Sequence, residues 1–355
     1  MGNDVASARE SAKTEETRRR RRARVILAAL LASVVLVYLV CVSLGSSQIP
    51  LGRVWDAILG NPYIWSDDLI VNTLRGPRVL AAAIIGAALS LGGMAMQALF
   101  RNPMASPSVL GISSGSSFGA AFYIAIGAGI WLSSWGTVIC SFACALAVLL
   151  LVYMLAYSKH GGTQTTVLLL AGMAVSALFS GLTSMIEFFS DADTVQSIVF
   201  WMLGSFDGMS WNDDLTMLVP VIAGSILICL NLRELNLLTA GEAKARNLGV
   251  NVPRVRLMLL IGSALLVAGT VAFCGVIGFV GLIIPHAFRS IVGPEHKRLA
   301  PICILGGAIF LMIIDTFARS ALPPYELPVG TVTSVIGAPF FLWILRSRKN
   351  MLWRT

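Results

Sequence analysis

A succession of ten apolar runs constrains the fold of this chain more than any other feature. A helix needs about 20 apolar residues to cross roughly 30 Å of hydrocarbon, and the runs are close to that length. Only 12% of the 355 residues are charged, about half the share in a soluble protein. We therefore predict an all-α polytopic membrane protein with spans at residues 25–45, 78–100, 108–130, 135–157, 164–189, 212–231, 254–274, 276–292, 299–319 and 328–346.

The basic residues are distributed unevenly between the two ends of these spans. If the N-terminus is cytoplasmic, the segments on that side hold every one of the 26 Lys and Arg residues except Arg53, Arg75, Arg78 and Arg319. Lys and Arg are retained on the cytoplasmic side of a membrane. We therefore expect both termini in the cytoplasm, and we interpret the net charge of +8 as a topology signal.

The polar N-terminal segment, residues 1–24, ends in a cluster of arginines. Arg18–Arg22 and Arg24 directly precede the first apolar run. That run is too long for a cleaved signal peptide, so we expect a disordered basic cytoplasmic tail followed by a signal anchor. Nucleic-acid binding is the alternative, but beside a membrane span the topological interpretation is favoured. Residues 347–355 are expected to form a cytoplasmic C-terminal tail.

The second and third runs are joined by a polar corner, Arg101–Pro107. Small residues recur at four-residue spacing on both sides of it, at Ala88, Gly92, Gly111, Gly115 and Gly119. Membrane helices associate through close backbone approach at small residues, and the prolines of the corner end a helix by removing an amide donor. The pattern predicts closely packed helices joined by a non-helical turn at the membrane surface.

A weak internal repeat relates the two halves of the chain. A shift of 176 residues aligns Arg78 with Arg254, Gly86 with Gly262 and Gly93 with Gly269. The same shift aligns Val79 with Val255, Ile85 with Ile261, Ala88 with Ala264 and Leu89 with Leu265. The matched second and seventh spans cross the membrane in opposite directions, as in the inverted repeats of transport proteins.

No catalytic or metal-binding set is evident in the sequence. There is no phosphate-binding glycine loop, the six cysteines lie singly in apolar runs, and the histidines have no metal-ligand spacing. Those histidines are His160, His286 and His296. Glu187 and Asp315 lie close to the outer face, and Arg319 follows Asp315 at ion-pair spacing. Since a proton-coupled carrier needs ionisable groups deep in the membrane, we expect energy from another source.

The longest cytoplasmic connection between spans, residues 232–253, contains NLLTAGEAKARNLGV. Thr239 or Gly241 can begin a short helix there, with Glu242 in its first turn, and Gly249 can end it. A helix lying on the membrane surface and a docking element for a soluble partner are both open from the spacing alone.

Seven motifs in order resemble the FecCD family, the permease subunits of binding-protein-dependent ATP-binding-cassette (ABC) importers for iron-siderophores, haem and cobalamin. They are RGPRVLAAAIIGAALSLGG, QALFRNPMASPSVLGISSG, LLLAGMAV, WMLGSF, LTAGEAKARNLGV, GVIGFVGLIIPHAFR and DTFARSALPPYELPVGTVTSVIGAPFF. The resemblance implies a type II importer permease in the bacterial plasma membrane. Its implied partners are a second permease subunit, two ATPases that bind ATP and Mg, and an extracytoplasmic binding protein. This chain would bind no cofactor and would not be an enzyme itself.

The resemblance also implies site residues. The coupling helices, at about residues 238–250, would contact an ATPase through Gly241, Glu242, Ala243, Lys244, Ala245, Arg246, Leu248 and Gly249. Asn102 and Met104, with Thr165 and Thr166, match the cytoplasmic gate. Arg53 and Arg319 fall where the family presents exposed arginines to the binding protein. For Arg319 the alternative is the ion pair with Asp315, and for Arg53 it is interfacial snorkelling.

The cargo implied by the family is a chelate, with siderophore ranked first, haem second and cobalamin third. A secondary carrier driven by an ion gradient is the alternative from another class. It would require a deep carboxylate, and neither Glu187 nor Asp315 is expected to lie deep enough. A membrane-embedded enzyme is disfavoured because no nucleophile, base or metal set clusters.

Overall fold

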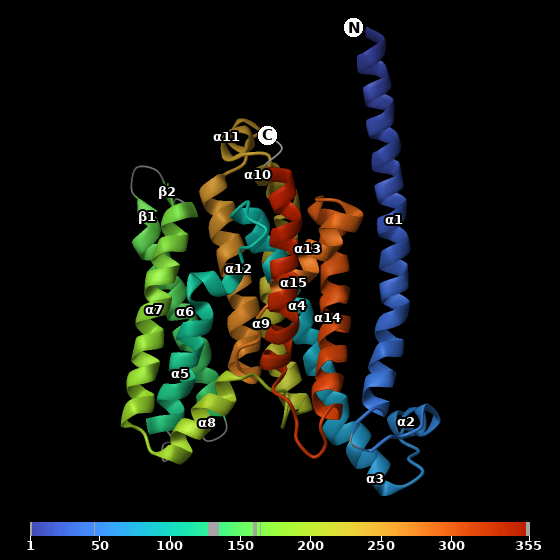
Figure 1. The fold of residues 1–355 in the computed structure, drawn as a ribbon, viewed down its shortest axis with the longest axis vertical. Coiled ribbons are helices and arrows are strands. Elements are labelled where there is room, and N and C mark those ends of the chain that lie inside the picture. Colours follow the sequence, from blue (N-terminus) through green and yellow to red (C-terminus); the bar gives the residue numbers. More distant parts are fainter. Residues whose placement is uncertain (1, 46, 127–134, 159–161, 164, 353–355) are drawn as a thin grey trace.

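The structure, a computed structural model, is an elongated bundle of helices (Figure 1). It describes residues 2–45, 47–126, 135–158, 162–163 and 165–352. Among these residues, a helix occupies each of the ten predicted spans. They are α1 (Gly2–Ser43), α4 (Gly76–Leu99), α5 (Ile112–Ile126), α6 (Gly136–Ala156), α7 (Thr165–Phe189), α9 (Trp211–Leu230), α12 (Val252–Cys274), α13 (Val280–Val292), α14 (His296–Ser320) and α15 (Val329–Leu352).

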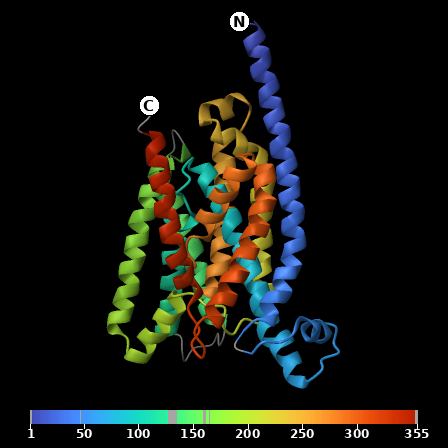
Figure 2. The same cartoon turned by 45° about the vertical axis from the view of Figure 1, so that its right-hand side comes forward.

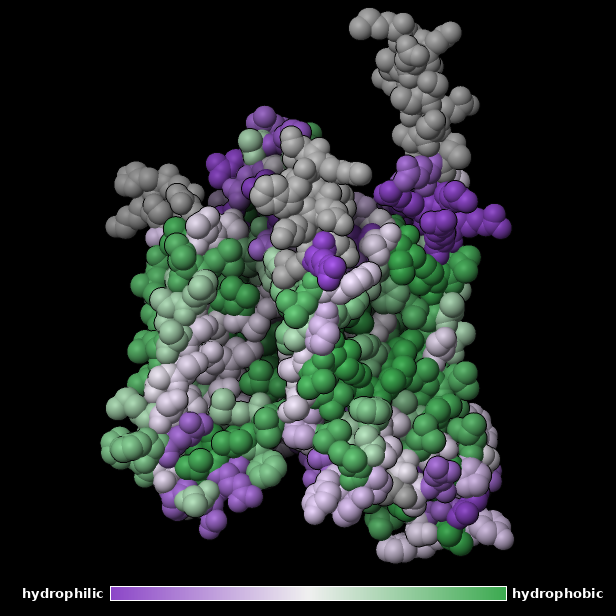
Figure 3. Space-filling view, in the orientation of Figure 1, coloured by the Kyte–Doolittle hydropathy of each residue, from purple (hydrophilic) through white to green (hydrophobic). Residues whose placement is uncertain are grey.

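Seven of these helices are long and apolar enough to cross a membrane among the described residues. The other three, α5, α13 and the apolar part of α15 (Val329–Trp343), are shorter apolar helices. An apolar band surrounds the middle of the bundle, and the hydrophilic residues gather towards its two ends (Figure 3). The chain is thus a multi-pass membrane protein, as the sequence predicts.

The remaining elements are short and lie at the ends of the bundle. The helical ones are α2 (Leu51–Ile58), α3 (Trp65–Asp68), the π-helix η1 (Leu69–Arg75), the 3-10 helix η2 (Pro107–Leu110), α8 (Ala192–Met202), α10 (Leu232–Thr239) and α11 (Glu242–Asn247). Strands β1 (Tyr157–Ser158) and β2 (Gly162–Thr163) form an antiparallel pair. The first turns of α1 and the last turns of α15 lie at the end of the bundle that carries α11 (Figures 1 and 2). We call this end the α11 end, and the opposite one the α8 end.

Helices α4 and α12 form the centre of the bundle. In their most apolar stretch, 83% of the residues of α4 and 72% of those of α12 are buried, against 17% for α7. Glycines permit this packing. A Cβ added to Gly86 would lie 2.1 Å from the carbonyl oxygen of Gly307 on α14, and one added to Gly93 would lie 2.0 Å from that of Gly281 on α13. Backbones therefore meet directly, which is how membrane helices pack without a hydrophobic driving force.

The small residues after the polar corner act in the same way. A Cβ on Gly119 would lie 2.3 Å from the carbonyl oxygen of Cys140 on α6, and one on Gly115 would lie 2.5 Å from Val148. The predicted close approach of α5 to its neighbour is confirmed. Gly92 differs, because its nearest neighbours are at the ordinary contact distance of 3.6 Å.

The inverted repeat is visible in the directions of the central helices. Helix α4 runs from the α8 end to the α11 end, and α12 runs back (Figure 1). Gly262, which the shift aligns with Gly86, also meets a glycine: a Cβ added to it would lie 3.0 Å from the carbonyl oxygen of Gly224 on α9. The aligned positions thus serve the same purpose in both halves.

The N-terminal tail differs from the prediction. We expected disorder over residues 1–24, but α1 is one continuous helix from Gly2 to Ser43. Ion pairs one turn apart support it, with Arg19 Nη2 2.6 Å from Glu15 Oε1 and Arg20 Nε 3.3 Å from Glu16 Oε1. Such pairs stabilise a helix that a membrane span has already nucleated. The C-terminal tail likewise continues α15 as far as Leu352.

Candidate functional site

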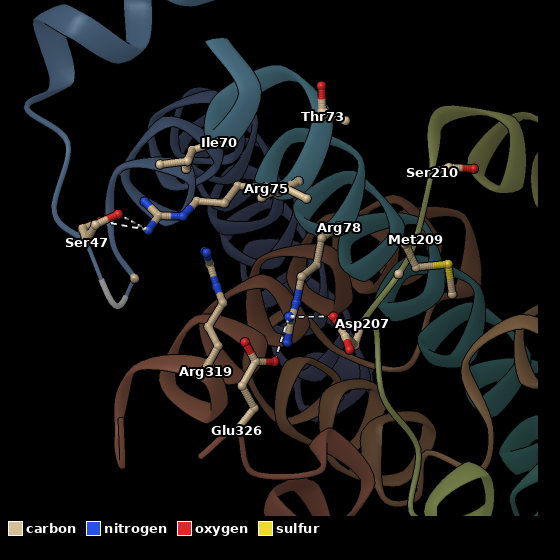
Figure 4. Close-up of a pocket in the computed structure, with 13 residues that line it drawn as sticks. Ser47, Ile70, Thr73, Arg75, Arg78, Asp207, Met209, Ser210, Arg319 and Glu326 are labelled. Atoms are coloured by element: carbon tan, nitrogen blue, oxygen red, sulfur yellow. Dashed lines mark hydrogen bonds and ion pairs between the residues drawn. The ribbon is translucent and has the colours of Figure 1, made fainter. Parts of the chain in front are cut away.

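The α8 end holds a charged cavity of about 470 Å³. Three arginines line it, Arg75 and Arg319 together with Arg78, and the acidic side chains are those of Asp207 and Glu326 (Figure 4). The positive and negative side chains face one another across a small space. Because these groups come from η1, α4, α14 and two loops, the cavity joins elements that are far apart in the sequence.

Arg78 is the centre of this ion-pair network. Its Nε lies 3.0 Å from Asp315 Oδ1, and its Nη1 lies 2.7 Å from Glu326 Oε2 and 3.9 Å from Asp207 Oδ1. Arg78 and Asp315 are both buried. Sequence reasoning missed this network, although the arginines left on the outer side of the membrane were the signal that could have found it.

Arg75 supports the same region through the backbone. Its guanidinium donates to the carbonyl oxygens of Val42, at 3.0 Å, and of Ser47, at 2.6 Å. Val42 lies in the last turn of α1, where carbonyl oxygens have no further intrahelical amide, and Ser47 follows the helix. Arg75 therefore fastens the end of α1 to the start of α4.

The structure corrects the expectation for Arg319. We expected an exposed docking charge, but its side chain is only 6% exposed. Its Nε lies 3.6 Å from Asp315 Oδ2, its Nη2 donates to the carbonyl oxygen of Cys41, and Thr316 Oγ1 lies 3.3 Å away. The alternative, an ion pair with Asp315, is confirmed. Burial against α1 leaves Arg319 a poor docking group.

Arg53 lies on α2, at the outer edge of the α8 end. Its side chain is 36% exposed, and its Nε lies 2.7 Å from Asp67 Oδ2. The ring of Tyr63 stacks 5.5 Å from the guanidinium carbon. Arg53 is therefore held at the surface by two neighbours rather than snorkelling freely, and its docking role stays a prediction.

At the α11 end, α11 lies beyond the ends of the neighbouring helices, and only α1 extends further in the same direction (Figure 1). Gly241, with φ of +117°, separates the two short helices, and Gly249, with φ of +83°, follows α11. Left-handed backbone of this kind favours glycine. The short helix predicted between these glycines is confirmed, and the residues expected to contact an ATPase lie together on it.

The side chains of α11 divide into an inner and an outer set. Ala245 is buried, and Glu242 forms an ion pair with Arg256 of α12. The outer set is exposed: Ala243, Lys244, Arg246 and Leu248, of which Leu248 is 67% exposed. Leu248 follows the two cations in the sequence, and an exposed leucine suits a protein partner better than water. Sequence reasoning placed Glu242 among the contact groups; in the structure Glu242 also braces the helix on α12, and its contact with an ATPase stays a prediction.

The polar corner of the predicted gate lies close to α10 and α11. Asn102 caps the turn, since its Oδ1 accepts from the Met104 amide at 3.0 Å. The guanidinium of Arg101 lies beside Gly241. A Cβ added to Gly241 would lie 4.0 Å from the Arg101 guanidinium, so the corner lies near the hinge between α10 and α11.

Thr165 and Thr166 begin α7 at the same end of the bundle. About two turns further along, η2 packs directly on α7, and a Cβ on Gly172 would lie 2.4 Å from the carbonyl oxygen of Val109. The turn after the polar corner is therefore packed on the helix that the two threonines begin. A small cavity of about 240 Å³ lies beyond it, bordered by Ser106, Ser108 and Phe279.

The outward face of α7 carries small and hydroxyl side chains at the level of the membrane. Ser180, Gly181 and Ser184 are exposed. They adjoin a cavity of about 330 Å³ that is also lined by Glu187 and by serines of α5. Polar side chains inside a membrane normally face protein or water. This face was not singled out from the sequence, although its serine and glycine spacing is visible there.

No cluster of three or more histidine, cysteine or carboxylate side chains that could hold a metal ion occurs among the described residues. His296 is buried, with its Nδ1 2.6 Å from Asn236 Oδ1. The cysteines are free thiols in the part of the chain that the structure describes. His160 lies outside the described residues.

Among the described residues, a bundle of ten apolar helices, with a charged cavity at one end and the exposed short helix α11 at the other, defines a polytopic membrane protein. Comparison with known proteins gives its family. The model of the FecCD transport family matches residues 30–347, and the chain belongs to that family.

Curated relatives span most of the chain. The cobalamin import system permease protein BtuC of Halobacterium salinarum is 42% identical over 281 residues, which are 79% of this chain and 74% of that protein. The hemin transport system permease protein HmuU of Yersinia pestis is 36% identical over 327 residues, or 90% of this chain and 97% of that protein.

Solved structures share the fold. A metal-chelate type ABC transporter in an inward-facing conformation superposes with a TM-score of 0.81 at 33% identity, covering 91% of this chain and 99% of that one. PsaBC from Streptococcus pneumoniae superposes with a TM-score of 0.53 at 16% identity, covering 81% of this chain and 94% of that chain. The second likeness concerns the fold alone.

Proposed function

We propose that this chain is the membrane-spanning permease subunit of an ABC importer that moves a metal chelate into the cytoplasm. The observation that carries the proposal is the exposed α11, which presents Lys244, Arg246 and Leu248 beyond the apolar band. Membership of the FecCD transport family supports it. Energy would come from ATP bound with Mg by a partner ATPase, and this chain would bind no cofactor and catalyse no reaction.

The contacts of α11 explain how a partner could drive the permease. Glu242 is paired with Arg256 of α12, and the Val250 amide donates to the Ala245 carbonyl at 3.0 Å. A push on α11 would therefore reach α12, which lies at the centre of the bundle. Coupling of this kind needs a rigid contact between the docked element and a helix that can take two positions.

The proximity of Arg101 to Gly241 would extend this coupling to the gate. When α11 shifts against the ATPase, the polar corner with Asn102 and Met104 would shift with it. Thr165 and Thr166 would form the facing wall, because η2 is packed on α7. Short polar side chains suit such a gate, since a deep binding well would slow release of the cargo.

A second permease subunit would cover the polar face of α7. Ser180 and Ser184 are exposed at membrane depth, where contact with lipid is unfavourable. Pairing two such faces would enclose a path lined by hydroxyls. We therefore propose a dimer whose path runs between the subunits, with the second subunit either identical or homologous.

The sidedness follows from the charges. Among the described residues, Lys and Arg concentrate at the α11 end, so we place that end and both termini in the cytoplasm. The α8 end would face outward in a bacterial plasma membrane and receive a binding protein. Arg53 is the docking charge that we retain there, because Arg319 is buried.

Three cargoes are to be compared. Ferric siderophore ranks first, as the commonest cargo implied by the family, with haem second and cobalamin third. Cobalamin and hemin appear in the names of two relatives. These relatives are permease proteins of a cobalamin import system and of a hemin transport system. The path itself would select weakly, and the binding protein would choose the cargo.

The test is ATP hydrolysis by this chain co-purified with its ATPase in lipid vesicles. Binding proteins loaded with ferric siderophore, haem or cobalamin are added in turn. We expect one loaded protein to stimulate hydrolysis and to identify the cargo. Replacing Glu242 and Arg246 together by Ala should lower transport and stimulated hydrolysis in parallel, and normal transport in that variant would contradict the coupling role.

A secondary carrier driven by an ion gradient remains the alternative function. The buried Asp315 is the observation that favours it, since buried carboxylates serve proton relays. However, Asp315 is paired with Arg78 at 3.0 Å and lies at the α8 end rather than mid-membrane. Uptake that needs no ATPase and follows an imposed proton gradient would support the carrier.

A further inference from the structure

The cluster formed by Arg18–Arg22 and Arg24, which we call the arginine collar, stands at the edge of the apolar band. Because α1 is continuous, the collar continues the helix that crosses the membrane. Figure 3 shows these hydrophilic side chains on α1, where the apolar band ends near the α11 end. Membrane phospholipid headgroups lie at this level.

Most of the collar faces away from the bundle. Arg19 is half-buried and lies one turn from the buried Ala23, so that side of α1 faces the protein. Arg18, Arg21 and Arg22 have spacings of three and four residues, which place them next to one another on the surface of the helix. All three are exposed, and none forms an ion pair with any side chain that the structure describes.

We propose that the arginine collar binds anionic phospholipid headgroups and that this binding is transmitted to α11. Guanidinium groups bind phosphate with two parallel hydrogen bonds, which an ammonium cannot do. A cluster of four to eight basic residues directly beside a span is the pattern that recognises anionic lipid. The proposal goes beyond the proposed function, because it assigns a lipid partner to a segment to which that function gives no role.

A chain of contacts leads from the collar to the coupling element. Arg298, near the start of α14, pairs with Glu16 of α1 and with Glu295. The guanidinium of Arg19 packs against Gly293, in the turn before α14. A headgroup that draws the collar outward would therefore act on the turn between α13 and α14.

That turn is joined in its own right to α10. The His296 amide donates to Asn236 Oδ1 at 2.9 Å, and His296 Nδ1 lies 2.6 Å from the same oxygen. His296 is buried, so the link is shielded from water. Asn236 belongs to α10, which leads through Gly241 into α11. The position of α11 is thereby linked to the lipid around α1.

The first experiment measures lipid preference. The full-length protein is equilibrated in micelles with equal amounts of phosphatidylglycerol and phosphatidylcholine, repurified, and its retained lipid counted by mass spectrometry. We expect enrichment in phosphatidylglycerol, and Arg18→Gln/Arg21→Gln/Arg22→Gln should reduce it by up to about fivefold per arginine removed. Salt at 1 M should abolish the enrichment, because the Debye length falls to about 3 Å.

The matched control is Arg233→Gln/Lys297→Gln/Arg254→Gln, which removes the same charge from exposed positions at the α11 end. It should keep the enrichment. If Arg18→Gln/Arg21→Gln/Arg22→Gln retains the same lipid ratio as the control variant and the unmodified protein, the proposal is overturned. Binding of an RNA or DNA oligomer by the collar, with no lipid preference, would overturn it equally. Should the first variant fail to fold, Lys at the three positions keeps the charge and should retain part of the preference.

The second experiment tests transmission. Hydrogen exchange of the amides of α10 and α11 is compared in nanodiscs of phosphatidylglycerol and of phosphatidylcholine. We expect a lipid-dependent difference in the unmodified protein, which Asn236→Ala should remove while lipid enrichment stays unchanged. An undiminished difference in Asn236→Ala would show that the contacts through His296 carry no signal.

Discussion

Arg78 on α4 and Asp315 on α14 are buried together at the α8 end, with Nε 3.0 Å from Oδ1. They are 237 residues apart in the sequence, so this contact ties the first half of the chain to the second. Arg319 approaches the other oxygen of the same carboxylate at 3.6 Å. One carboxylate therefore holds two buried guanidinium groups.

Asp315→Asn should destabilise the protein strongly. It leaves two buried cations without their shared anion, and breaking a buried pair by removing one partner costs about 3–5 kcal/mol. Thermal unfolding of the solubilised protein measures the effect. Glu326→Gln is the control, because that side chain is 47% exposed and an exposed pair contributes less than about 1 kcal/mol. Equal losses in both variants would contradict the central role of Asp315.

Gly86→Ala should destabilise the bundle although it adds a single methyl group. The new Cβ would lie 2.1 Å from the Gly307 carbonyl oxygen, so α4 and α14 would have to move apart. Overpacking of this kind costs about 1–3 kcal/mol. Gly181→Ala is the matched control, since nothing lies within 4 Å of a Cβ at that position. A thermal unfolding midpoint that is unchanged in Gly86→Ala would disprove the close packing.

The helices, their directions and the small-residue contacts could be predicted, because they follow from local apolar length and from spacing. The network around Arg78 could not, since it joins residues that only the packed bundle brings together. Arg319 shows the limit most clearly. Its ion pair with Asp315 follows from helical spacing. Its burial depends on where α1 packs, and the local sequence around Arg319 does not determine that position.

The N-terminal segment and Glu242 show the same limit. A polar stretch was expected to be disordered, whereas continuity with a membrane helix and the pairs of Glu15 and Glu16 make it helical. Glu242 was expected to contact a partner because the resemblance places it on the coupling helix. Arg256, on the next helix, competes for it, and sequence spacing does not show which contact prevails.

Lys244→Ala/Arg246→Ala should weaken assembly with the ATPase. Both side chains are exposed, and rim charges contribute under about 1 kcal/mol each, so a loss of up to about thirtyfold in affinity is expected. Titration of the purified ATPase into the reconstituted permease measures it. Glu242→Gln should behave differently: the subunits should still assemble, but hydrolysis should proceed with less transport, because α11 is no longer braced on α12. Identical behaviour of the two variants would contradict this division.

Acid should loosen the start of α8 before the rest of the bundle. The Thr194 amide donates to Asp191 Oδ1 at 2.8 Å, and this bond lowers the pKa of that carboxyl below its ordinary value of 3.8. Because the folded pKa is lowered, the stabilisation is present above 3.8 and is lost as the pH falls through the lower folded value. Hydrogen exchange at Thr194 across this range measures it. Asp191→Asn cannot titrate, so its exchange rate at Thr194 should show no additional increase at acid pH. An increase that persists in this variant would mean that a different group causes it.

The most direct test of the proposed function is uptake by proteoliposomes that contain the permease and its ATPase. Loaded binding protein is placed outside and ATP inside, and accumulated chelate is counted. We predict uptake that requires internal ATP and the loaded binding protein, and that is insensitive to collapse of the ion gradients. Accumulation without ATP that follows an imposed proton or sodium gradient would contradict the importer assignment and favour the carrier.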